Sequence, residues 1–343
     1  MPADPTLRHL TSWLDAPDGA WDRCLSRALH HGAHPGWPRA ATDKALGLVF
    51  MAPSLRTRAS MEGAAARLGA HAAVLTPGQG TWGMEHRANV KMDGAAAEHV
   101  REAAGVLSQY YDALGVRTFA TLTDKLSDRA DAMFDAFVQS ATVPVVSLES
   151  ARWHPCQALA DAATLRVRYG KELKGRKFVL QWAPHPKALP RAVPNSALLM
   201  AARLGFDVTV ARPDGFALEP DVMESARHTA ALSGGSVSET DQVDAAAEGA
   251  HVVYAKAWSG AAVYDDPDAE AAARAKHAKW TVTERRMDRT DEAAFMHCLP
   301  VRRGVVVEDG VLDGPHALHL RQAAFRLHAQ MAILEWVWKL KEG

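Results

Sequence analysis

Short apolar runs alternate with segments of helical periodicity along almost the whole chain. The runs that read as strands cover 46–51, 72–75, 113–119, 143–148, 177–182, 206–210, 237–238, 251–254 and a last one near 295–300. Strands separated by helices are typical of parallel sheets, because the crossover between two parallel strands needs room for a helix. The sequence therefore predicts an α/β fold made of doubly wound parallel sheets.

The length of the chain indicates more than one core. At 343 residues it exceeds the usual single domain, and its 48% hydrophobic content is enough for two cores. We expect domains at 1–152 and 153–320, joined by interdomain helices, with the last segment (321–343) completing the first domain. The main helices are expected over 6–32, interrupted by a turn at Asp18-Gly19, and over 97–112, 125–141, 155–169, 220–233 and 321–341, with another that follows Asn195.

Residue usage argues against several classes of protein. Lys+Arg 39 against Asp+Glu 40 gives a net charge of -1, so neither nucleic acid nor an anionic membrane is an expected partner. Three scattered cysteines favour a reducing compartment. The first residues lack the apolar core of a signal peptide, and no run approaches the roughly 18 apolar residues of a membrane span. We expect a cytoplasmic protein.

A hydroxyl and two guanidinium groups follow the first strand directly. Pro53 ends the strand, and Ser54, Arg56 and Arg58 fall where the next helix begins. A helix N-terminus offers unpaired N–H groups and a partial positive charge, and arginine matches phosphate oxygens two at a time. The segment therefore resembles a phosphate cradle. A serine N-cap beside two solvated arginines is the structural alternative.

Polar side chains also follow the other strands. Those expected at strand ends are Arg117, Glu149, His154, Gln157, His185, Lys256 and Cys298. Ligands of open α/β sheets bind outside the carboxyl ends of the strands, so the joint occurrence favours binding sites. Each residue alone has a structural interpretation as well: Cys298 as a small buried hydrophobe, Lys256 as a solvated charge and Trp258 as core.

Two loops carry further candidates. The irregular segment 76–94 is long enough to be functional, and its Trp82 must pack either under its own loop or into a ligand site or neighbouring subunit. A surface loop is expected at 31–36, where His31 and His34 have no third ligand nearby. No Gly-x-Gly-x-x-Gly follows a strand, which argues against a dinucleotide, and we expect neither a metal nor another cofactor.

Three of these motifs, in this order and at these separations, resemble the aspartate/ornithine carbamoyltransferase family. They are Ser54-x-Arg56-Thr57-Arg58, His154-Pro155-x-Gln157 and His297-Cys298-Leu299-Pro300. Within the family the chain is most similar to transcarbamylases of Nα-acylated ornithines, through Thr81-Trp82, Met92-Asp93-Gly94, His185-Pro186 and Leu299-Pro300-x-Arg302-Arg303. The resemblance implies transfer of a carbamoyl group from carbamoyl phosphate to the δ-amine of an Nα-acyl-L-ornithine, in arginine biosynthesis.

The resemblance also implies roles for individual residues. The first domain would bind carbamoyl phosphate through Ser54, Leu55, Arg56, Thr57, Trp82, Arg117, His154, Gln157, Cys298, Leu299 and Arg326. Catalytic roles would fall to Arg56, Arg117, His154, Gln157, Cys298 and Arg326, and acylornithine would meet Glu149, His185, Lys256, Arg302 and Ala97. Trp82 would come from a neighbouring subunit of a homotrimer. The chain departs from the family before Arg326, where Ala324 and Phe325 replace an acidic residue and its polar partner.

Three positions bear on the acceptor. Lys256 would repel the α-ammonium of free ornithine, whereas an acylated substrate is anionic at that end. Acetyl-type enzymes carry a glutamate where this chain has Ala97 and a lysine where it has Val306. Because a glutamate would repel the second carboxylate of a succinyl group, N-succinyl-L-ornithine is the expected substrate, with N-acetyl-L-ornithine a close second. Ordinary ornithine carbamoyltransferase and a non-catalytic anion-binding protein are the alternatives.

Overall fold

The computed structural model describes residues 7–340, and the chain forms two compact units. Unit 1 comprises the residues up to Ala160 and those from Phe325 onward, whereas unit 2 comprises Asp161–Ala324. Both divisions fall inside helices, namely α6 (Pro155–Tyr169) and α13 (His319–Val337), a few residues after the boundaries expected from the sequence. Within the described part of the chain, no helix combines the length and apolarity that crossing a membrane requires.

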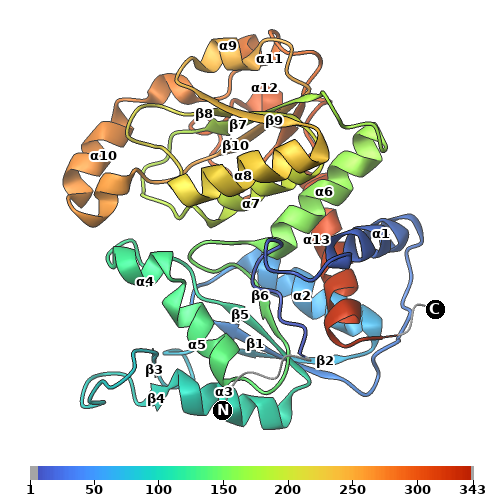
Figure 1. Ribbon diagram of the computed structural model, residues 1–343, viewed down its shortest axis with the longest axis vertical. Helices are drawn as coiled ribbons and strands as arrows, with labels where there is room; N and C mark the ends of the chain where they lie inside the picture. Colours follow the sequence, from blue (N-terminus) through green and yellow to red (C-terminus); the bar gives the residue numbers. More distant parts are fainter. Residues whose placement is uncertain (1–6, 341–343) are drawn as a thin grey trace. The chain divides into compact units, whose positions relative to one another are not determined.

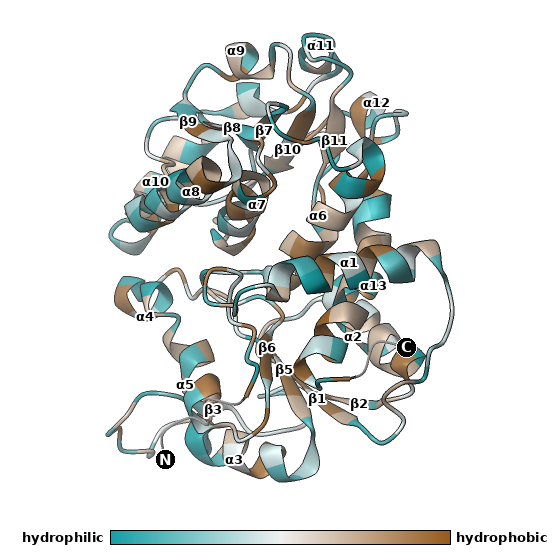
Figure 2. Cartoon of the chain, turned by 45° about the vertical axis from the view of Figure 1, so that its right-hand side comes forward, coloured by the Kyte–Doolittle hydropathy of each residue, from teal (hydrophilic) through white to brown (hydrophobic). Residues whose placement is uncertain are grey.

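Unit 1 is built on a four-stranded parallel sheet in the order β2-β1-β5-β6 (Figure 1). Its strands are β1 (Ala45–Phe50), β2 (His71–Leu75), β5 (Ala113–Arg117) and β6 (Val145–Ser147). The two central strands, β1 and β5, are buried almost throughout, as their continuous apolar runs require, and Figure 2 shows hydrophobic residues along them. The predicted α/β class is confirmed.

Helices cover both faces of this sheet. They are α1 (Ala20–Ala33), α2 (Leu55–Leu68), α3 (Val100–Tyr110) and α5 (Ala132–Ser140), with the end of α13, while the short α4 (Lys125–Arg129) precedes α5. On one face, Val100 of α3 and Phe137 of α5 join Leu114 and Val116 of β5 in a common core. On the other, α1, α2 and α13 lie together (Figure 1). Unit 1 is therefore doubly wound.

The helix predicted over 125–141 is two helices, because the chain breaks between α4 and α5. Asp131 has a positive φ of 53°, which a helix cannot contain. Its carboxylate accepts hydrogen bonds from the Ser150 hydroxyl and from the backbone N–H of Ala151 at 2.9 Å. A contact distant in sequence thus overrides the local helical pattern.

The prediction of a helix over 6–32 is wrong for its first half. Residue 6 lies outside the described residues, and the chain from residue 7 to Gly19 is not helical. Leu10 instead extends the sheet: its N–H donates to Val145 at 2.9 Å and its carbonyl accepts from Ser147 at 2.8 Å. α1 begins after the predicted turn at Asp18-Gly19, where Gly19 has a φ of 76°. It then continues to Ala33, so the loop predicted to start at residue 31 is also wrong there.

The end of α13 packs on α1 through a largely buried ionic cluster, and the residues from Phe325 onward belong to unit 1. Glu335 accepts two hydrogen bonds from Arg27, each at 2.9 Å, and lies 3.0 Å from His31 Nε2. Burial opposes ionisation of Glu335, but the hydrogen bonds from His31 and Arg27 prevail and hold its pKa at about 2. His31 is therefore part of the core rather than of a surface loop.

Replacing Glu335 with glutamine should destabilise unit 1 by about 2 kcal/mol, because the buried Arg27 guanidinium loses its counter-charge. Urea unfolding at pH 7 measures this difference. Since the pKa of Glu335 lies below its ordinary 4.5, the stabilisation is complete above that pH and is lost as the pH falls toward 2. Glu62→Gln removes an exposed pair with Arg58 and is the control, expected to change stability by less than about 0.5 kcal/mol. Equal unfolding curves for Glu335→Gln and the unmodified protein would contradict this account.

Unit 2 contains a five-stranded parallel sheet in the order β11-β10-β7-β8-β9. Its strands are β7 (Lys177–Trp182), β8 (Asp207–Ala211), β9 (Ser236–Thr240), β10 (Val252–Lys256) and β11 (Ala294–Met296). The helices are α7 (Ala192–Arg203), α8 (Pro220–Ser233), α9 (Val243–Ala247), α10 (Pro267–Ala275), α11 (Glu284–Met287) and α12 (Asp309–Leu312). α7 begins three residues before the predicted Asn195, since Pro194 is tolerated in a first helical turn.

Candidate active site

The strand order of each unit places predicted site residues at a topological switch point. In unit 1 the chain leaves β1 toward β2 on one side, whereas β5 and β6 lie on the other. In unit 2 the same reversal separates β7, which leads to β8 and β9, from β10 and β11. Ligands of doubly wound sheets bind outside the carboxyl ends of the strands at such points. Ser54 follows β1, Arg117 ends β5, His185 follows β7 and Lys256 ends β10.

Three buried side chains from distant parts of the chain meet at the first of these points. Arg326 of α13 donates from Nη1 to Gln157 Oε1 at 2.7 Å and from Nη2 to Thr57 Oγ1 at 2.9 Å. Thr57 lies in the first turn of α2, whose N-cap Ser54 accepts a hydrogen bond from the Thr57 N–H at 3.3 Å. Ala324 and Phe325 therefore do not prevent Arg326 from reaching the predicted residues of unit 1.

The carboxylate of Glu149 lies beside Arg117 and His154 at the same switch point. Its Oε2 accepts a hydrogen bond from Arg117 Nη1 at 2.5 Å and lies 3.7 Å from His154 Nε2. Glu149 has a φ of 131°, a backbone conformation that costs a non-glycine residue energy and is typical of functional sites. Arg117 Nε is buried and has no hydrogen-bond partner among residues 7–340, so this guanidinium keeps a donor for a ligand.

The electrostatics of the cluster suit an anion. Burial, followed by the charges of Arg326, Arg117 and Arg56, lowers the pKa of His154 well below 6.5. The imidazole of His154 is therefore neutral at pH 7. Three guanidinium groups beside one neutral imidazole, with one carboxylate to offset them, leave a net positive environment at the start of α2.

The two arginines of the first motif have different surroundings from each other and from Leu55, which precedes Arg56. Positions two apart in a helix lie on different faces. Arg56 acts on the buried His154, whereas Arg58 is exposed and pairs with Glu62 at 3.4 Å. Leu55 is exposed, so only its backbone is placed to serve an anion. The structure thus removes Arg58 from the cradle that the motif suggested.

The loop of unit 1 holds Trp82 and Ala97 close together. β3 (Met84–Glu85) pairs with β4 (Glu98–His99), and the N–H of Glu98 donates a hydrogen bond to the Gly83 carbonyl at 3.3 Å. Ala97, which precedes Glu98, therefore lies beside Gly83, the residue that follows Trp82. The Trp82 side chain is 70% exposed, which rules out burial under its own loop.

The switch point of unit 2 carries a cationic cluster around His185. His185 Nε2 accepts a hydrogen bond from Arg302 Nε at 3.0 Å, because arginine can only donate. The proton of the neutral imidazole is then on Nδ1, which donates to the Lys187 carbonyl at 2.8 Å; the Lys187 backbone nitrogen lies 3.0 Å from the same atom. Burial, together with the charges of Arg302, Lys256 and Arg274, lowers the pKa of His185 despite that backbone hydrogen bond. Lys256 Nζ donates to the Ala257 carbonyl at 3.0 Å and is half-buried.

The remaining predicted residues of unit 2 are placed as follows. Cys298 and Leu299 follow β11 and are partly exposed. Trp258 is fully buried and donates from Nε1 to the Phe216 carbonyl at 2.8 Å, which favours its interpretation as core. Arg274, which donates a hydrogen bond to the His185 carbonyl, was not predicted from the sequence. The only signal for Arg274 was its four-residue spacing from Glu270 in an alanine-rich helix.

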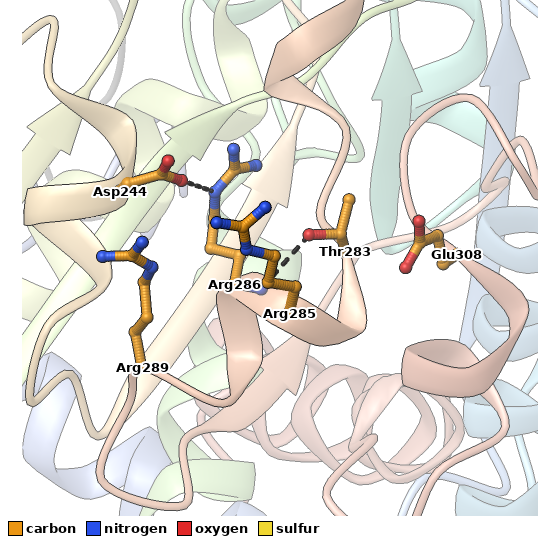
Figure 3. Close-up of a pocket in the computed structure, with 6 residues that line it drawn as sticks. All are labelled: Asp244, Thr283, Arg285, Arg286, Arg289 and Glu308. Atoms are coloured by element: carbon orange, nitrogen blue, oxygen red, sulfur yellow. Dashed lines mark hydrogen bonds and ion pairs between the residues drawn. The ribbon is translucent and has the colours of Figure 1, made fainter.

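A second polar pocket of unit 2 lies elsewhere, lined by Asp244, Thr283, Arg285, Arg286, Arg289 and Glu308 (Figure 3). Arg286 Nε donates to Asp244 at 2.9 Å, and Arg289 pairs with Glu248 at 3.4 Å. The Arg289 carbonyl accepts from Gly249, just before β10 begins, so this part of the pocket is at the amino-terminal end of that strand. Within residues 7–340, no group of three or more His, Cys, Asp or Glu side chains is arranged to hold a metal ion.

Comparison with known families matches nearly the whole chain. A model of the aspartate/ornithine carbamoyltransferase carbamoyl-P binding domain matches residues 8–167, and a model of the Asp/Orn binding domain of the same family matches residues 191–337. The chain belongs to the aspartate/ornithine carbamoyltransferase family. The predicted resemblance is confirmed. Thr57, Arg117 and His154 lie within the first match and Arg326 within the second. Lys256 and Arg302 also lie within the second match, whereas His185 lies between the two matches.

Individual members of the family are similar to this chain over most of its length. This carbamoyltransferase is 42% identical to the N-acetylornithine carbamoyltransferase of Xanthomonas campestris, over 85% of this chain and 86% of that protein. It is 38% identical to the N-succinylornithine carbamoyltransferase of Bacteroides thetaiotaomicron, over 88% of each. A similar solved structure is N-acetyl-L-ornithine transcarbamylase with one glutamate replaced by alanine, complexed with carbamyl phosphate and N-succinyl-L-norvaline. It superposes on this chain with a TM-score of 0.93 at 39% sequence identity. The superposition covers 96% of this chain and 100% of that one.

Proposed function

We propose that this protein transfers the carbamoyl group of carbamoyl phosphate to the δ-amine of an Nα-acyl-L-ornithine, giving an N-acyl-L-citrulline and phosphate in arginine biosynthesis. The observation that carries the proposal is the neutral, buried His154 beside Arg56, Arg117 and Arg326 at the start of α2. A dianionic phosphate fits this positive environment, and a neutral imidazole can donate a hydrogen bond to a carbonyl oxygen without competing for the charge.

The reaction needs little beyond position and charge. The neutral δ-amine attacks the carbamoyl carbon and its lone pair forms the new C–N bond, while the carbonyl oxygen becomes an oxyanion. His154 and the guanidinium groups of Arg117 and Arg56 stabilise that charge. The C–O bond to phosphate then breaks, and the departing phosphate accepts the proton of the amine. Preorganised donors and fixed geometry supply the acceleration.

The cations of unit 2 support an acylated acceptor. Lys256 and Arg302, the latter oriented by its hydrogen bond to His185, would supply the cationic donors for carboxylate oxygens. The α-ammonium of free ornithine would be repelled there, whereas acylation removes that charge and leaves the α-carboxylate. Relatives named for both N-acetylornithine and N-succinylornithine support the same class of acceptor.

N-succinyl-L-ornithine is our preferred acceptor because of Ala97. N-acetyl-L-ornithine transcarbamylase variants with one glutamate replaced by alanine, proline, serine or valine are complexed with N-succinyl-L-norvaline. We infer that Ala97 occupies the position of that glutamate. A small neutral side chain leaves room for the second carboxylate of a succinyl group and does not repel it.

N-acetyl-L-ornithine is the second candidate, and one observation favours it. The relative from Xanthomonas campestris is more similar over the whole chain than the relative from Bacteroides thetaiotaomicron. Overall identity reports mainly on the fold, however, whereas the acyl group meets only a few side chains. We therefore give Ala97 the greater weight.

Trp82 and Ala97 are proposed to serve a neighbouring subunit of a homotrimer. Trp82 is a large aromatic side chain exposed at the tip of a loop, and such residues are typical of interfaces. Because the β3–β4 pairing holds Ala97 beside Gly83, the two residues would reach the same site together. Mass measurement by light scattering tests the trimer directly; a monomer at assay concentration would contradict it.

Initial rates with single acceptors test the proposed reaction. Purified protein is mixed with carbamoyl phosphate and either N-succinyl-L-ornithine, N-acetyl-L-ornithine or L-ornithine, and the ureido product is measured. We expect product with the acylated acceptors and little with L-ornithine. Rapid turnover of L-ornithine alone would support ordinary ornithine carbamoyltransferase, and binding of carbamoyl phosphate without any product would support a non-catalytic anion-binding protein.

A further inference from the structure

We propose that Glu270 and Arg274, a buried ion pair on α10, position the side chains that bind the acylornithine. The inference rests on the proposed function and deepens it, because neither residue is expected to touch the substrate. Both belong to unit 2, as do His185 and Lys256, which they would hold in place. They are positioning residues of that site.

The pair is built as a rigid unit. Glu270 and Arg274 are one helical turn apart, with 2% and 6% of their surfaces exposed. Arg274 Nη2 donates to Glu270 Oε2 at 2.9 Å, and its Nε lies within 3.3 Å of both carboxylate oxygens. A two-pronged, desolvated pair of this kind fixes the directions of its remaining donors and acceptors. The rest of α10 is largely exposed, so the pair is the inward-facing part of the helix.

Each partner makes one further hydrogen bond to a loop that leaves a strand of the switch point. Arg274 Nη1 donates to the His185 carbonyl at 2.8 Å, and Glu270 Oε1 accepts from the Gly260 N–H at 3.2 Å. Gly260 ends the short loop that starts at Lys256, and a Cβ there would come within 2.6 Å of the Gly215 carbonyl oxygen. One ion pair thus holds the backbone of both loops.

The state of the His185 ring depends on the same contacts. Its carbonyl is held by Arg274, and its Nδ1 donates to the Lys187 carbonyl in the same turn. The charged groups that act on the ring are Arg302, Lys256 and Arg274, all of which favour the neutral form. The carboxylate of Glu270 offsets part of the Arg274 charge. Substitutions in the pair should therefore change both the geometry and the titration of His185.

Three substitutions separate these effects in the full-length protein. Arg274→Gln removes the charge and most hydrogen bonds, so KM for the acylornithine should rise about tenfold while KM for carbamoyl phosphate stays within about twofold. The acid limb of the pH profile of kcat/KM should move to higher pH, because His185 loses a neighbouring cation and its pKa rises. Arg274→Lys keeps the charge and should leave the acid limb in place. Glu270→Gln leaves the charge of Arg274 without its counter-charge and should move the acid limb to lower pH.

Arg286→Gln is the matched control. Arg286 is also 6% exposed, binds Asp244 at 2.9 Å and donates to the Lys279 carbonyl at 3.0 Å, but no hydrogen bond joins it to His185 or Gly260 (Figure 3). The Arg286→Gln variant should retain the KM values for both substrates and the position of the acid limb of kcat/KM. Unchanged acylornithine KM in Arg274→Gln, or the same changes in Arg286→Gln, would overturn the inference.

NMR titration of His185 keeps the inference separate from the proposed function. The His185 pKa should be higher in Arg274→Gln than in the unmodified protein and lower in Glu270→Gln. If the unmodified protein carbamoylates no acylornithine, the proposed function fails, while this titration still reports on the pair. If Arg274→Gln does not fold, Arg274→Lys and Glu270→Gln carry the test. Identical His185 titrations in all variants would contradict the positioning role.

Discussion

Replacing Arg56 with alanine is expected to reduce kcat/KM for carbamoyl phosphate about a thousandfold. Arg56 lies in the first turn of α2, and its charge acts on the buried His154. Its loss would remove a donor to the phosphate and part of the positive field in which the oxyanion forms. Steady-state rates at saturating acylornithine measure the effect. The fold should be retained, since Arg56 contributes to the site rather than to the core of α2.

Arg58→Ala is the control for that experiment. Arg58 lies two residues further along α2, is exposed and pairs with Glu62. We expect its kcat/KM to stay within about twofold of the unmodified protein, because an exposed pair of this kind contributes little. Near-normal turnover in Arg56→Ala would contradict the assignment of the cradle, and equal losses in the two variants would show that the effect is not local.

Replacing Ala97 with glutamate is expected to reverse the preference between acyl groups. A carboxylate at this position would face the second carboxylate of N-succinyl-L-ornithine, and kcat/KM for that acceptor should fall about thirtyfold. N-acetyl-L-ornithine has no such group, so its kcat/KM should change by less than about threefold. The measurement is kcat/KM on both acceptors at constant ionic strength. The loss should diminish at high salt because the loop is exposed.

Ala97→Gln separates charge from size. Glutamine fills nearly the same volume as glutamate but carries no charge, so it should retain most of the preference for N-succinyl-L-ornithine. Ala95→Glu places the charge two residues away on the same exposed loop and should have a smaller effect. If glutamate and glutamine at residue 97 lower the rate equally, steric exclusion rather than repulsion determines the choice of acyl group.

Much of the fold could be predicted from the sequence because its strands are continuous apolar runs. β1, β5 and β7 are buried along nearly their whole length, and such strands leave an unambiguous hydrophobic signal. The errors occur where a distant contact outweighs local preference. Leu10 joins the edge of β6, and Asp131 leaves the helical conformation to bind the loop at Ser150. No local pattern reports such partners.

The candidate site could be predicted in part for a related reason. Residues such as Arg117 and Lys256 directly follow apolar strands, so their place at the sheet edge is visible in the sequence. Residue type and spacing alone did not distinguish Arg56 from Arg58, which occupy different faces of α2; only the family resemblance selected Arg56. Residue type and spacing also offered no reason to select Arg274, because α10 reads as a charged, alanine-rich surface helix and its buried face depends on tertiary packing.

A one-pot competition tests the central claim most directly. The protein is given equal concentrations of N-succinyl-L-ornithine, N-acetyl-L-ornithine and L-ornithine with limiting carbamoyl phosphate, and the three ureido products are measured by mass spectrometry. Their early ratio equals the ratio of the three kcat/KM values. We predict N-succinyl-L-citrulline as the main product, N-acetyl-L-citrulline as the second and almost no L-citrulline. A mixture dominated by L-citrulline would contradict the proposal that this enzyme acts on acylated ornithine.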